Sequence, residues 1–323
     1  MKGYIASRIA QTAIVLFGVL VLMWILFRLI PGDPTSMYIS GRLTPEEINA
    51  VRRLWGLDAP LYVQFLDYCL NLLKGDLGVS FFYREPVITV ITPRLVNTLM
   101  LMGPAMIMAM ILGTIFGSYL GWRRGSKREK IGVLLSFLFR SFPVYLVGIV
   151  AIMVFSFHLG WFPLGGIRTI GLVSFSWIER FLDLSHHLIL PLVVALVYFI
   201  GDVVVIARTS ILELIGEEFL EFAKARGLSD SRVRRIATRN AIIPVITYST
   251  IMVGFALGGQ VLLEIVFAWP GIGALLVDSV SRRDYPIAQA GFFIMALGVI
   301  LSNLIVDLLY GYLDPRITYD RKS

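Results

Sequence analysis

Apolar residues gather in six runs along the chain, and each run is long enough to cross a lipid bilayer. A membrane span needs about 20 apolar residues, because the hydrocarbon core is roughly 30 Å thick and an α-helix rises about 1.5 Å per residue. Polar segments separate the runs. The pattern therefore predicts an all-α membrane protein with six transmembrane helices. The predicted spans are residues 9–30, 97–120, 131–157, 188–206, 242–263 and 288–310.

The polar segments between the runs differ in their content of lysine and arginine. If both termini face the cytoplasm, the inner segments hold most of the 29 basic residues. Cytoplasmic segments of membrane proteins carry such an excess. The long segment 31–96 counts little in this comparison, because long loops cross the membrane largely regardless of charge. We therefore expect both termini inside and segment 31–96 outside.

Segment 31–96 contains signals for two helices. Thr44 can cap a first helix, with Pro45 at its first position and Glu47 three residues after the cap. This helix should run to about Trp55. A second helix is predicted over Leu61–Lys74, ending at Gly75. The outer loop is thus expected to be helical, either as a cap over the outer mouth or as a packing lid.

A charge-dense insert, EEFLEFAKARGLSDSRVRRIATRN, lies between the fourth and fifth runs at residues 217–240. Its first half is rich in helix-forming residues, and a glycine at position 227 supplies a stop. The sequence Ser229-Asp230-Ser231 can cap a second helix that ends near Arg239. The insert therefore predicts a helical hairpin. The apolar side of the first helix needs a partner protein, or it rests on lipid headgroups.

Composition agrees with a membrane protein and argues against several other classes. Charged residues make up 16% of the chain, against about 25% in soluble domains, and 57% of the residues are hydrophobic. The net charge of +7 reflects the bias of the inner loops, so no nucleic-acid partner is expected. Three histidines without HExxH or Cys/His spacing predict no metal site. No catalytic residues are assigned, and the single Cys69 is interpreted as a packed residue.

Several residues inside the spans stand out from their apolar surroundings. Arg140 and Asp202 are expected at similar depth, where they would either pair or line a transport pathway. Glycines at positions 113, 117 and 121 recur every four residues, which lets another helix approach closely. Three further residues are candidates for the pathway: Gly254, Gly258 and Gln260.

The hairpin also resembles a known motif. Glu221-Phe222-Ala223, followed after three residues by Gly227, is similar to the EAA loop of ABC-importer permeases. The usual I-x-L-P ending is replaced by Ala237-Thr238-Arg239-Asn240, and this departure resembles the dipeptide/oligopeptide/nickel branch. Motifs of the same branch occur in order along almost the whole chain: Ile30–Pro34, Gly75–Ser80, Phe267–Gly273, Arg283–Pro286 and Leu313–Ile317.

The resemblance implies a type I ABC-importer permease fold and a pore-forming subunit. It implies a first span with an outer helical loop over 1–93, a five-helix core over 94–311 and a cytoplasmic tail over 312–323. The coupling loop would lie at 207–240 and dock on a cytoplasmic ATPase. The residues expected to couple to the ATPase are Glu217, Glu218, Phe219, Glu221, Phe222, Ala223 and Gly227.

The resemblance also implies partners and a location. The partners are a second, homologous permease that is usually non-identical, two ABC ATPases and an extracytoplasmic substrate-binding protein, within the cytoplasmic membrane of a bacterium or archaeon. The chain has no G-x-x-x-x-G-K-[ST] motif, so ATP and magnesium are expected on the ATPase partners and no cofactor on this chain. Peptides are the expected cargo, with nickel, glutathione or oligosaccharide as alternatives.

Two other classes of protein compete with this interpretation. An ion-coupled secondary transporter would place charges at the membrane midplane in paired broken helices. An intramembrane enzyme would need a nucleophile and base, or a metal constellation. Neither pattern is found in this sequence.

Overall fold

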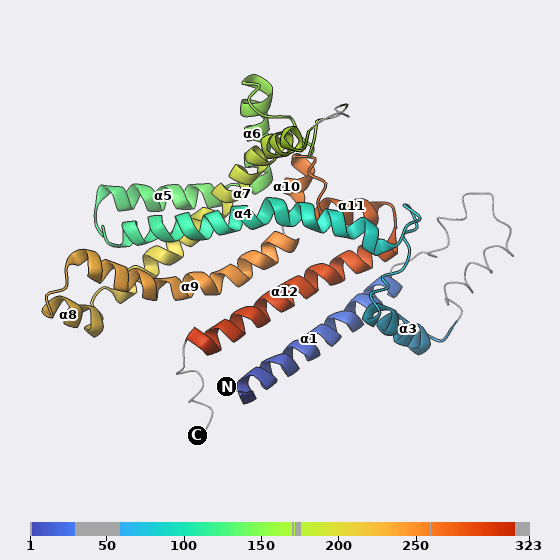
Figure 1. Cartoon of the computed structure of the whole chain (residues 1–323), viewed down its shortest axis with the longest axis horizontal. Coiled ribbons are helices and arrows are strands. Elements are labelled where there is room, and N and C mark those ends of the chain that lie inside the picture. The colour runs from blue at the N-terminus through green and yellow to red at the C-terminus, as the bar shows by residue number, and fades with distance from the viewer. Residues whose placement is uncertain (1, 30–58, 170, 172–175, 259, 314–323) are drawn as a thin grey trace. The chain divides into compact units, whose positions relative to one another are not determined.

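The computed structural model describes residues 2–29, 59–169, 171, 176–258 and 260–313, and the regular elements in these residues are helices (Figure 1). They are α1 (Lys2–Leu29), α3 (Leu61–Leu73), α4 (Val87–Gly121), α5 (Lys127–Ser141), α6 (Val144–Ala151), the π-helix η2 (Ile152–His158), α7 (Trp177–Leu214), α8 (Glu218–Ala225), α9 (Asp230–Gly258), α10 (Val261–Val266), α11 (Ile272–Ser281) and α12 (Tyr285–Leu313). The expectation of an all-helical chain is confirmed for this part of the protein.

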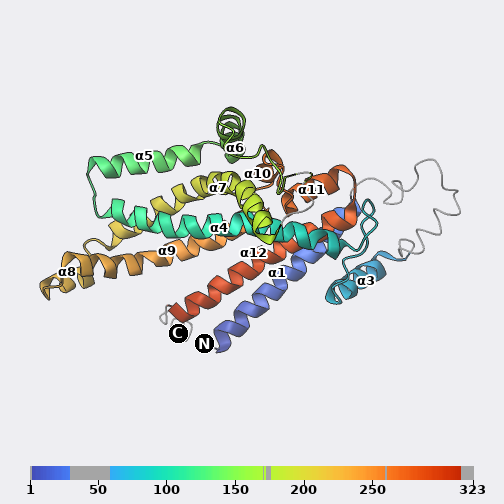
Figure 2. The same ribbon diagram turned by 45° about the horizontal axis from the view of Figure 1, so that its top comes forward.

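The chain divides into two compact units, and the first combines residues 1–96 with residues 271–323. Within it, helices α1 and α12 lie side by side along most of their length (Figures 1 and 2). Arg8 Nη1 lies 3.3 Å from Asp307 Oδ2, and the hydroxyl of Tyr4 donates to the backbone oxygen of Asp307 at 3.0 Å. An ionisable residue of α12 is thus paired with the first turns of α1.

The first unit also joins two motifs that are about 200 residues apart in the sequence. The carboxylate of Asp284, which is only 1% exposed, accepts hydrogen bonds from the Ser80 hydroxyl and from the backbone amides of Phe81 and Phe82. A buried carboxylate is stable only when its oxygens are hydrogen-bonded. This network joins the segment Gly75–Ser80 to the segment Arg283–Pro286.

The second unit comprises residues 97–270 and contains α5, α7, α9 and most of α4. The repeated glycines of α4 at positions 113, 117 and 121 face α7: a Cβ added at Gly113 would lie 2.6 Å from Val203 Cβ, and one at Gly121 would lie 2.8 Å from Ile211 Cβ. The sequence predicted close packing at these glycines without naming the partner. The structure identifies the partner helix as α7.

The third predicted span, residues 131–157, is not one straight helix. Helix α5 ends at Ser141, and α6 starts after Pro143 at an angle of 93°. Phe142 is extended, with φ −87° and ψ 134°. Proline disfavours helical geometry in the preceding residue and lacks an amide donor, which is why the helix breaks here. The predicted span 131–157 is therefore divided into two helices at Pro143.

The described residues include four helices long and apolar enough to cross a membrane, or five if the bent pair is one span. The four are α1, α4, α7 and α12. The predicted fifth span, residues 242–263, begins inside α9, and α9 ends at Gly258, before the predicted end. The total of six spans stays a prediction.

The helix predicted over Leu61–Lys74 is confirmed, whereas the location of this loop outside the membrane stays a prediction. Helix α3 occupies Leu61–Leu73, and Gly75 follows it with φ +76°. The Gly75 amide donates to the Leu72 carbonyl and the Asp76 amide to the Asn71 carbonyl, which is the Schellman pattern of a helix end. Burial raises the pKa of the Cys69 thiol, as suits a packed residue. The helix predicted over residues 44–55 lies outside the described residues.

Candidate functional site: the hairpin between α7 and α9

Helix α8 is connected to its neighbours by two glycines in left-handed conformations. Gly216, between α7 and α8, has φ +106°, and Gly227, between α8 and α9, has φ +77°. An L-residue with a side chain is strained in this region, whereas glycine is not. The two glycines therefore allow α8 to turn sharply at both of its ends, and Figure 1 shows α8 beside the start of α9.

The end of α8 at Gly227 is a complete Schellman motif. The Gly227 amide donates to the Lys224 carbonyl at 2.8 Å, and the Leu228 amide donates to the Ala223 carbonyl at 3.2 Å. Leu228 also packs beside Ala223 in the same apolar cluster, which is the hydrophobic contact that accompanies this motif. The turn is thus fixed by hydrogen bonds and by packing together.

One face of α8 is anchored to the helices around it. Leu220 and Ala223 are buried in a cluster with Ile211 of α7 and Val233 of α9, and Trp122, at the end of α4, packs against this cluster. Burying an apolar side chain of this size contributes about 1.5–3 kcal/mol. Movement of α8 should therefore be transmitted to α7, α9 and the end of α4.

The opposite face of α8 is exposed and mixes aromatic and acidic side chains. Phe222 is 65% exposed and Phe219 is 41% exposed, and the acidic residues Glu217, Glu218 and Glu221 are exposed as well. These acidic residues occupy the first turn or its cap, where the helix dipole favours negative charge. Large exposed aromatic side chains on a short, anchored helix are typical of a docking surface.

The sequence prediction of a hairpin holds with one correction. The first helix and the Gly227 turn are where the sequence placed them. The second helix was expected to end near Arg239, but α9 continues without a break to Gly258. Pro244 lies inside it, so this proline did not end the helix. The hairpin is consequently continuous with the apolar second half of α9.

Of the seven residues assigned to ATPase coupling, five form the exposed face of α8: Glu217, Glu218, Phe219, Glu221 and Phe222. Ala223 faces inward, and Gly227 forms the turn. Sequence reasoning missed Trp122, whose ring also has the Arg234 guanidinium 5.7 Å from its centroid. Nothing in the local sequence marks Trp122, because it reaches the hairpin only through the tertiary fold.

A buried ion pair lies where α7 approaches the hairpin. Arg208 of α7 donates from Nε to Glu129 Oε1 at 2.9 Å and from Nη2 to the same oxygen. The other oxygen of Glu129 accepts from the Gly125 amide at 2.6 Å. Ser126 caps α5 by accepting from the Glu129 amide. The spacing of Ser126 and Glu129 was readable as a helix start, but the partner Arg208 was not.

Arg140 and Asp202 are brought together by α5 and α7. Arg140 Nη1 lies 2.9 Å from Asp202 Oδ1, and the hydroxyl of Tyr248 in α9 donates to Asp202 Oδ2 at 2.6 Å. The Asp202 side chain is 16% exposed, whereas that of Arg140 is 60% exposed. One carboxylate therefore links three helices. Its contribution to transport stays a prediction.

We expect Asp202→Ala to destabilise the protein more than Arg140→Ala, because it leaves both Arg140 and Tyr248 without their carboxylate partner. The double variant should be less destabilised than the sum of the single variants, with a coupling energy of roughly 0.5–3 kcal/mol. Thermal unfolding in detergent measures this, with Tyr248→Phe as the variant that removes only the hydroxyl. Additive effects would contradict the pairing.

The three pathway candidates lie at the end of α9. Gly254 and Gly258 are within α9, and Gln260 precedes α10. Gln260 is 4% exposed, and its Oε1 has no hydrogen-bond partner among the described residues. Nearby in the same unit, the Thr98 hydroxyl donates to the buried Glu264 Oε1 at 2.6 Å. These are buried polar groups in a largely apolar chain, and their role in a pathway stays a prediction.

Long apolar helices combined with an anchored hairpin that exposes aromatic and acidic residues define a membrane transport subunit. Comparison with known proteins places the chain within this class. Residues 109–319 match the family "Binding-protein-dependent transport system inner membrane component", and residues 1–102 match the N-terminal part of such membrane components. The chain belongs to this family, which confirms the resemblance to ABC-importer permeases.

Individual relatives match the chain over its whole length. The di/tripeptide transport system permease protein DppB of Pseudomonas aeruginosa is 39% identical to this chain over an alignment of 337 positions. The alignment covers 99% of this chain and 100% of the relative. The oligopeptide transport system permease protein AppB of Bacillus subtilis is 35% identical with the same coverage. The glutathione transport system permease protein GsiC of Escherichia coli is 36% identical, again with the same coverage.

Proposed function

We propose that this chain is the pore-forming permease subunit of an ATP-driven importer that carries peptides across the cytoplasmic membrane. The observation that carries the proposal is the construction of α8: one face is anchored to α7 and α9, and the other exposes Phe219 and Phe222. A helix built in this way can bind a separate protein and transmit its movement to membrane helices.

The proposal includes a topology. Six spans cross the membrane, with the bent pair of α5 and α6 as the third and the apolar part of α9 as the fifth. Both termini and the hairpin face the cytoplasm, because the basic residues concentrate in those segments. The segment between α1 and α4, which contains α3, then lies outside.

The proposed partners follow from the family and from the chemistry that this chain lacks. The sequence contains no phosphate-binding loop, so ATP and magnesium would be bound by two cytoplasmic ATPase subunits. One of these subunits would bind α8. A second, homologous permease completes the pore, and an extracytoplasmic binding protein delivers the cargo. The family description names dependence on a binding protein, which supports this last partner.

Peptides are the favoured cargo because two of the relatives carry di/tripeptide or oligopeptide transport in their names. Glutathione, named for a third relative, is itself a small peptide, and it is the second candidate. An ion-coupled secondary transporter is the alternative from a different class. It would transport cargo in vesicles that lack any ATPase.

The test is ATP hydrolysis by the importer reconstituted with its two ATPases, the second permease and the binding protein. Peptide-loaded binding protein should stimulate hydrolysis. Phe222→Ala should lower the stimulated rate about tenfold, because removing an exposed aromatic anchor from an interface typically weakens it by more than 1 kcal/mol. Membrane insertion should be unchanged, since Phe222 is largely exposed in the chain alone.

A matched control is Phe157→Ala. Phe157 lies in η2, outside the hairpin, and its side chain is 71% exposed. The variant therefore removes another exposed phenylalanine side chain and leaves α8 unchanged. Its stimulated hydrolysis should equal that of the unmodified importer. Equal rates for both variants would contradict the assignment of α8 as the ATPase contact, and uptake in vesicles without ATPases would overturn the class of transporter.

A further inference from the structure

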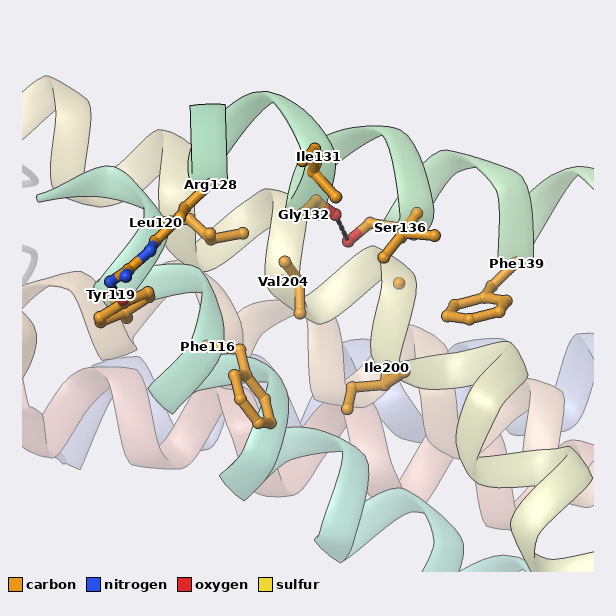
Figure 3. Close-up of a pocket in the computed structure, with 12 residues that line it drawn as sticks. Phe116, Tyr119, Leu120, Arg128, Ile131, Gly132, Ser136, Phe139, Ile200 and Val204 are labelled. Atoms are coloured by element: carbon orange, nitrogen blue, oxygen red, sulfur yellow. Dashed lines mark hydrogen bonds between the residues drawn. The ribbon is translucent and has the colours of Figure 1, made fainter. Parts of the chain in front are cut away.

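A second site, unrelated to the hairpin, is a pocket of about 510 Å³ between α4, α5 and α7. Its walls are apolar side chains such as Phe116, Leu135 and Phe139. Figure 3 shows Phe116 and Phe139 among them. The rim is open, since these three side chains are 52%, 43% and 41% exposed. Ser136 contributes a hydroxyl, but that group donates to the Gly132 carbonyl at 2.9 Å. The pocket therefore presents apolar surface over most of its length.

One end of this pocket is different. Arg128 and Tyr119 lie together there, while Phe139 lies at the opposite end (Figure 3). Arg128 Nη1 donates to the Tyr119 hydroxyl at 3.1 Å, and the Arg123 guanidinium lies 4.7 Å from the centroid of the same ring. Two guanidinium groups thus converge on one tyrosine. The Tyr119 bond uses one of the five N–H donors of Arg128, so donors remain for an anion.

The surrounding turn strengthens this positive end. Residues 122–130, which comprise the turn after α4 and the first turn of α5, contain five basic residues: Arg123, Arg124, Lys127, Arg128 and Lys130. Its acidic residue, Glu129, is 5% exposed, and its carboxylate is already bound by Arg208 and the Gly125 amide. Glu129 therefore does not neutralise the arginines beside the pocket. The mouth of the pocket is complementary to an anion.

We propose that the pocket binds an anionic phospholipid, with an acyl chain along the apolar walls and the phosphate at Arg128, next to the contact between Arg123 and Tyr119. These basic residues lie between the apolar part of α4 and the apolar part of α5, so we expect them at the boundary of the bilayer, where lipid phosphates are found. Water would gain few hydrogen bonds inside the pocket, whereas an acyl chain fills it favourably. A peptide is a poor occupant, because its backbone groups would find few partners there.

This inference depends on the chain being a membrane protein of its family and not on the identity of the cargo. The bound lipid would fill the space that α4, α5 and α7 leave between them. Gly201 of α7 lies against the α5 backbone, since a Cβ added there would be 2.6 Å from the backbone carbonyl oxygen of Ser136. The helices are thus already in close contact beside the pocket, and a lipid would fill the space where they diverge.

The experiment is native mass spectrometry of the full chain, purified in detergent with its co-purifying subunits. Phosphatidylglycerol and phosphatidylcholine with identical acyl chains are titrated separately. We expect phosphatidylglycerol to bind about tenfold more tightly, as expected for a charge-assisted hydrogen bond. Arg128→Gln should remove most of this preference, and Arg128→Lys should keep part of it. An excess of inorganic phosphate should not displace the lipid.

Two matched variants distinguish binding in the pocket from the effect of net surface charge and from misfolding. Arg124→Gln removes one charge from the same turn, but Arg124 does not line the pocket, so the lipid preference should be retained. Leu135→Trp keeps the charge and fills the pocket, so binding of both lipids should fall. Thermal unfolding in detergent that contains phosphatidylcholine shows which variants are folded. If Arg128→Gln is not folded, the lipid preference is compared between Arg128→Lys and the unmodified protein instead.

Four results would overturn the proposal. The first is equal binding of the two lipids by the unmodified protein. The second is an equal loss of preference in Arg124→Gln and Arg128→Gln, which would indicate surface charge alone. The third is efficient cross-linking of a cysteine at Phe139 to another subunit, because the pocket would then be a protein interface. Displacement of the lipid by inorganic phosphate would likewise show a phosphate site instead of a lipid site.

Discussion

Replacing Gly117 with valine is expected to prevent α4 from packing against α7 and to reduce the yield of folded protein severely. A Cβ at position 117 would lie 2.7 Å from Ala207 Cβ and closer still to the Val204 carbonyl oxygen. That oxygen belongs to the backbone of a long helix and has little freedom to move. Overpacking costs about 1–3 kcal/mol even where side chains can rearrange, and the larger side chain here meets backbone.

The measurement is the monodisperse fraction in size-exclusion chromatography, together with the thermal unfolding midpoint in detergent. Gly103→Val is the matched control, because Gly103 lies in the same helix and a Cβ there would meet nothing within 4 Å. It should be close to the unmodified protein in both measurements. Similar behaviour of the two variants would mean that the α4–α7 contact is not the reason for the glycine repeat.

The glycine repeat illustrates how far sequence reasoning reaches in this protein. Spacing of four residues places glycines on one helix face, and that geometry is local, so the close approach was predictable. Which helix approaches depends on contacts between residues about 90 positions apart. No local pattern in the α4 sequence encodes Val203 or Ala207 of α7.

The same distinction holds for helix ends and for buried polar groups. The ends of α3 and α8 were predictable, because a Schellman turn depends on a glycine a few residues away. The partners of Glu129 and of Asp284 were not, because Arg208 and Ser80 come from distant parts of the chain. The Arg140–Asp202 contact was foreseen only because charges are so rare within the spans that few partners existed.

Proline was the least reliable local signal. Pro143 marks a bend of 93° between α5 and α6, whereas Pro244 lies within an uninterrupted α9. A proline removes one hydrogen bond from a helix, and the surrounding packing decides whether the helix tolerates that loss. A proline in the sequence therefore shows where a helix can break but does not determine whether it breaks.

Gly227→Val is expected to leave membrane insertion intact and to lower transport-coupled ATP hydrolysis about tenfold. Gly227 has φ +77°, and a side chain there meets open space, so the penalty is conformational strain and not a clash. Left-handed geometry costs roughly 1–2 kcal/mol for an L-residue, and more strain is expected for a β-branched one. The turn should therefore relax, and its two Schellman hydrogen bonds to the Lys224 and Ala223 carbonyls should be lost.

Gly227→Asn provides the matched control, because asparagine tolerates left-handed geometry and also serves at helix ends. If the turn positions α8 on an ATPase, the asparagine variant should retain most of the stimulated hydrolysis that the valine variant loses. Equal activity in the two variants would show that coupling does not depend on the conformation of this turn. Loss of membrane insertion in the valine variant alone would instead assign Gly227 to folding, since α9 continues from the hairpin without a break into its apolar second half.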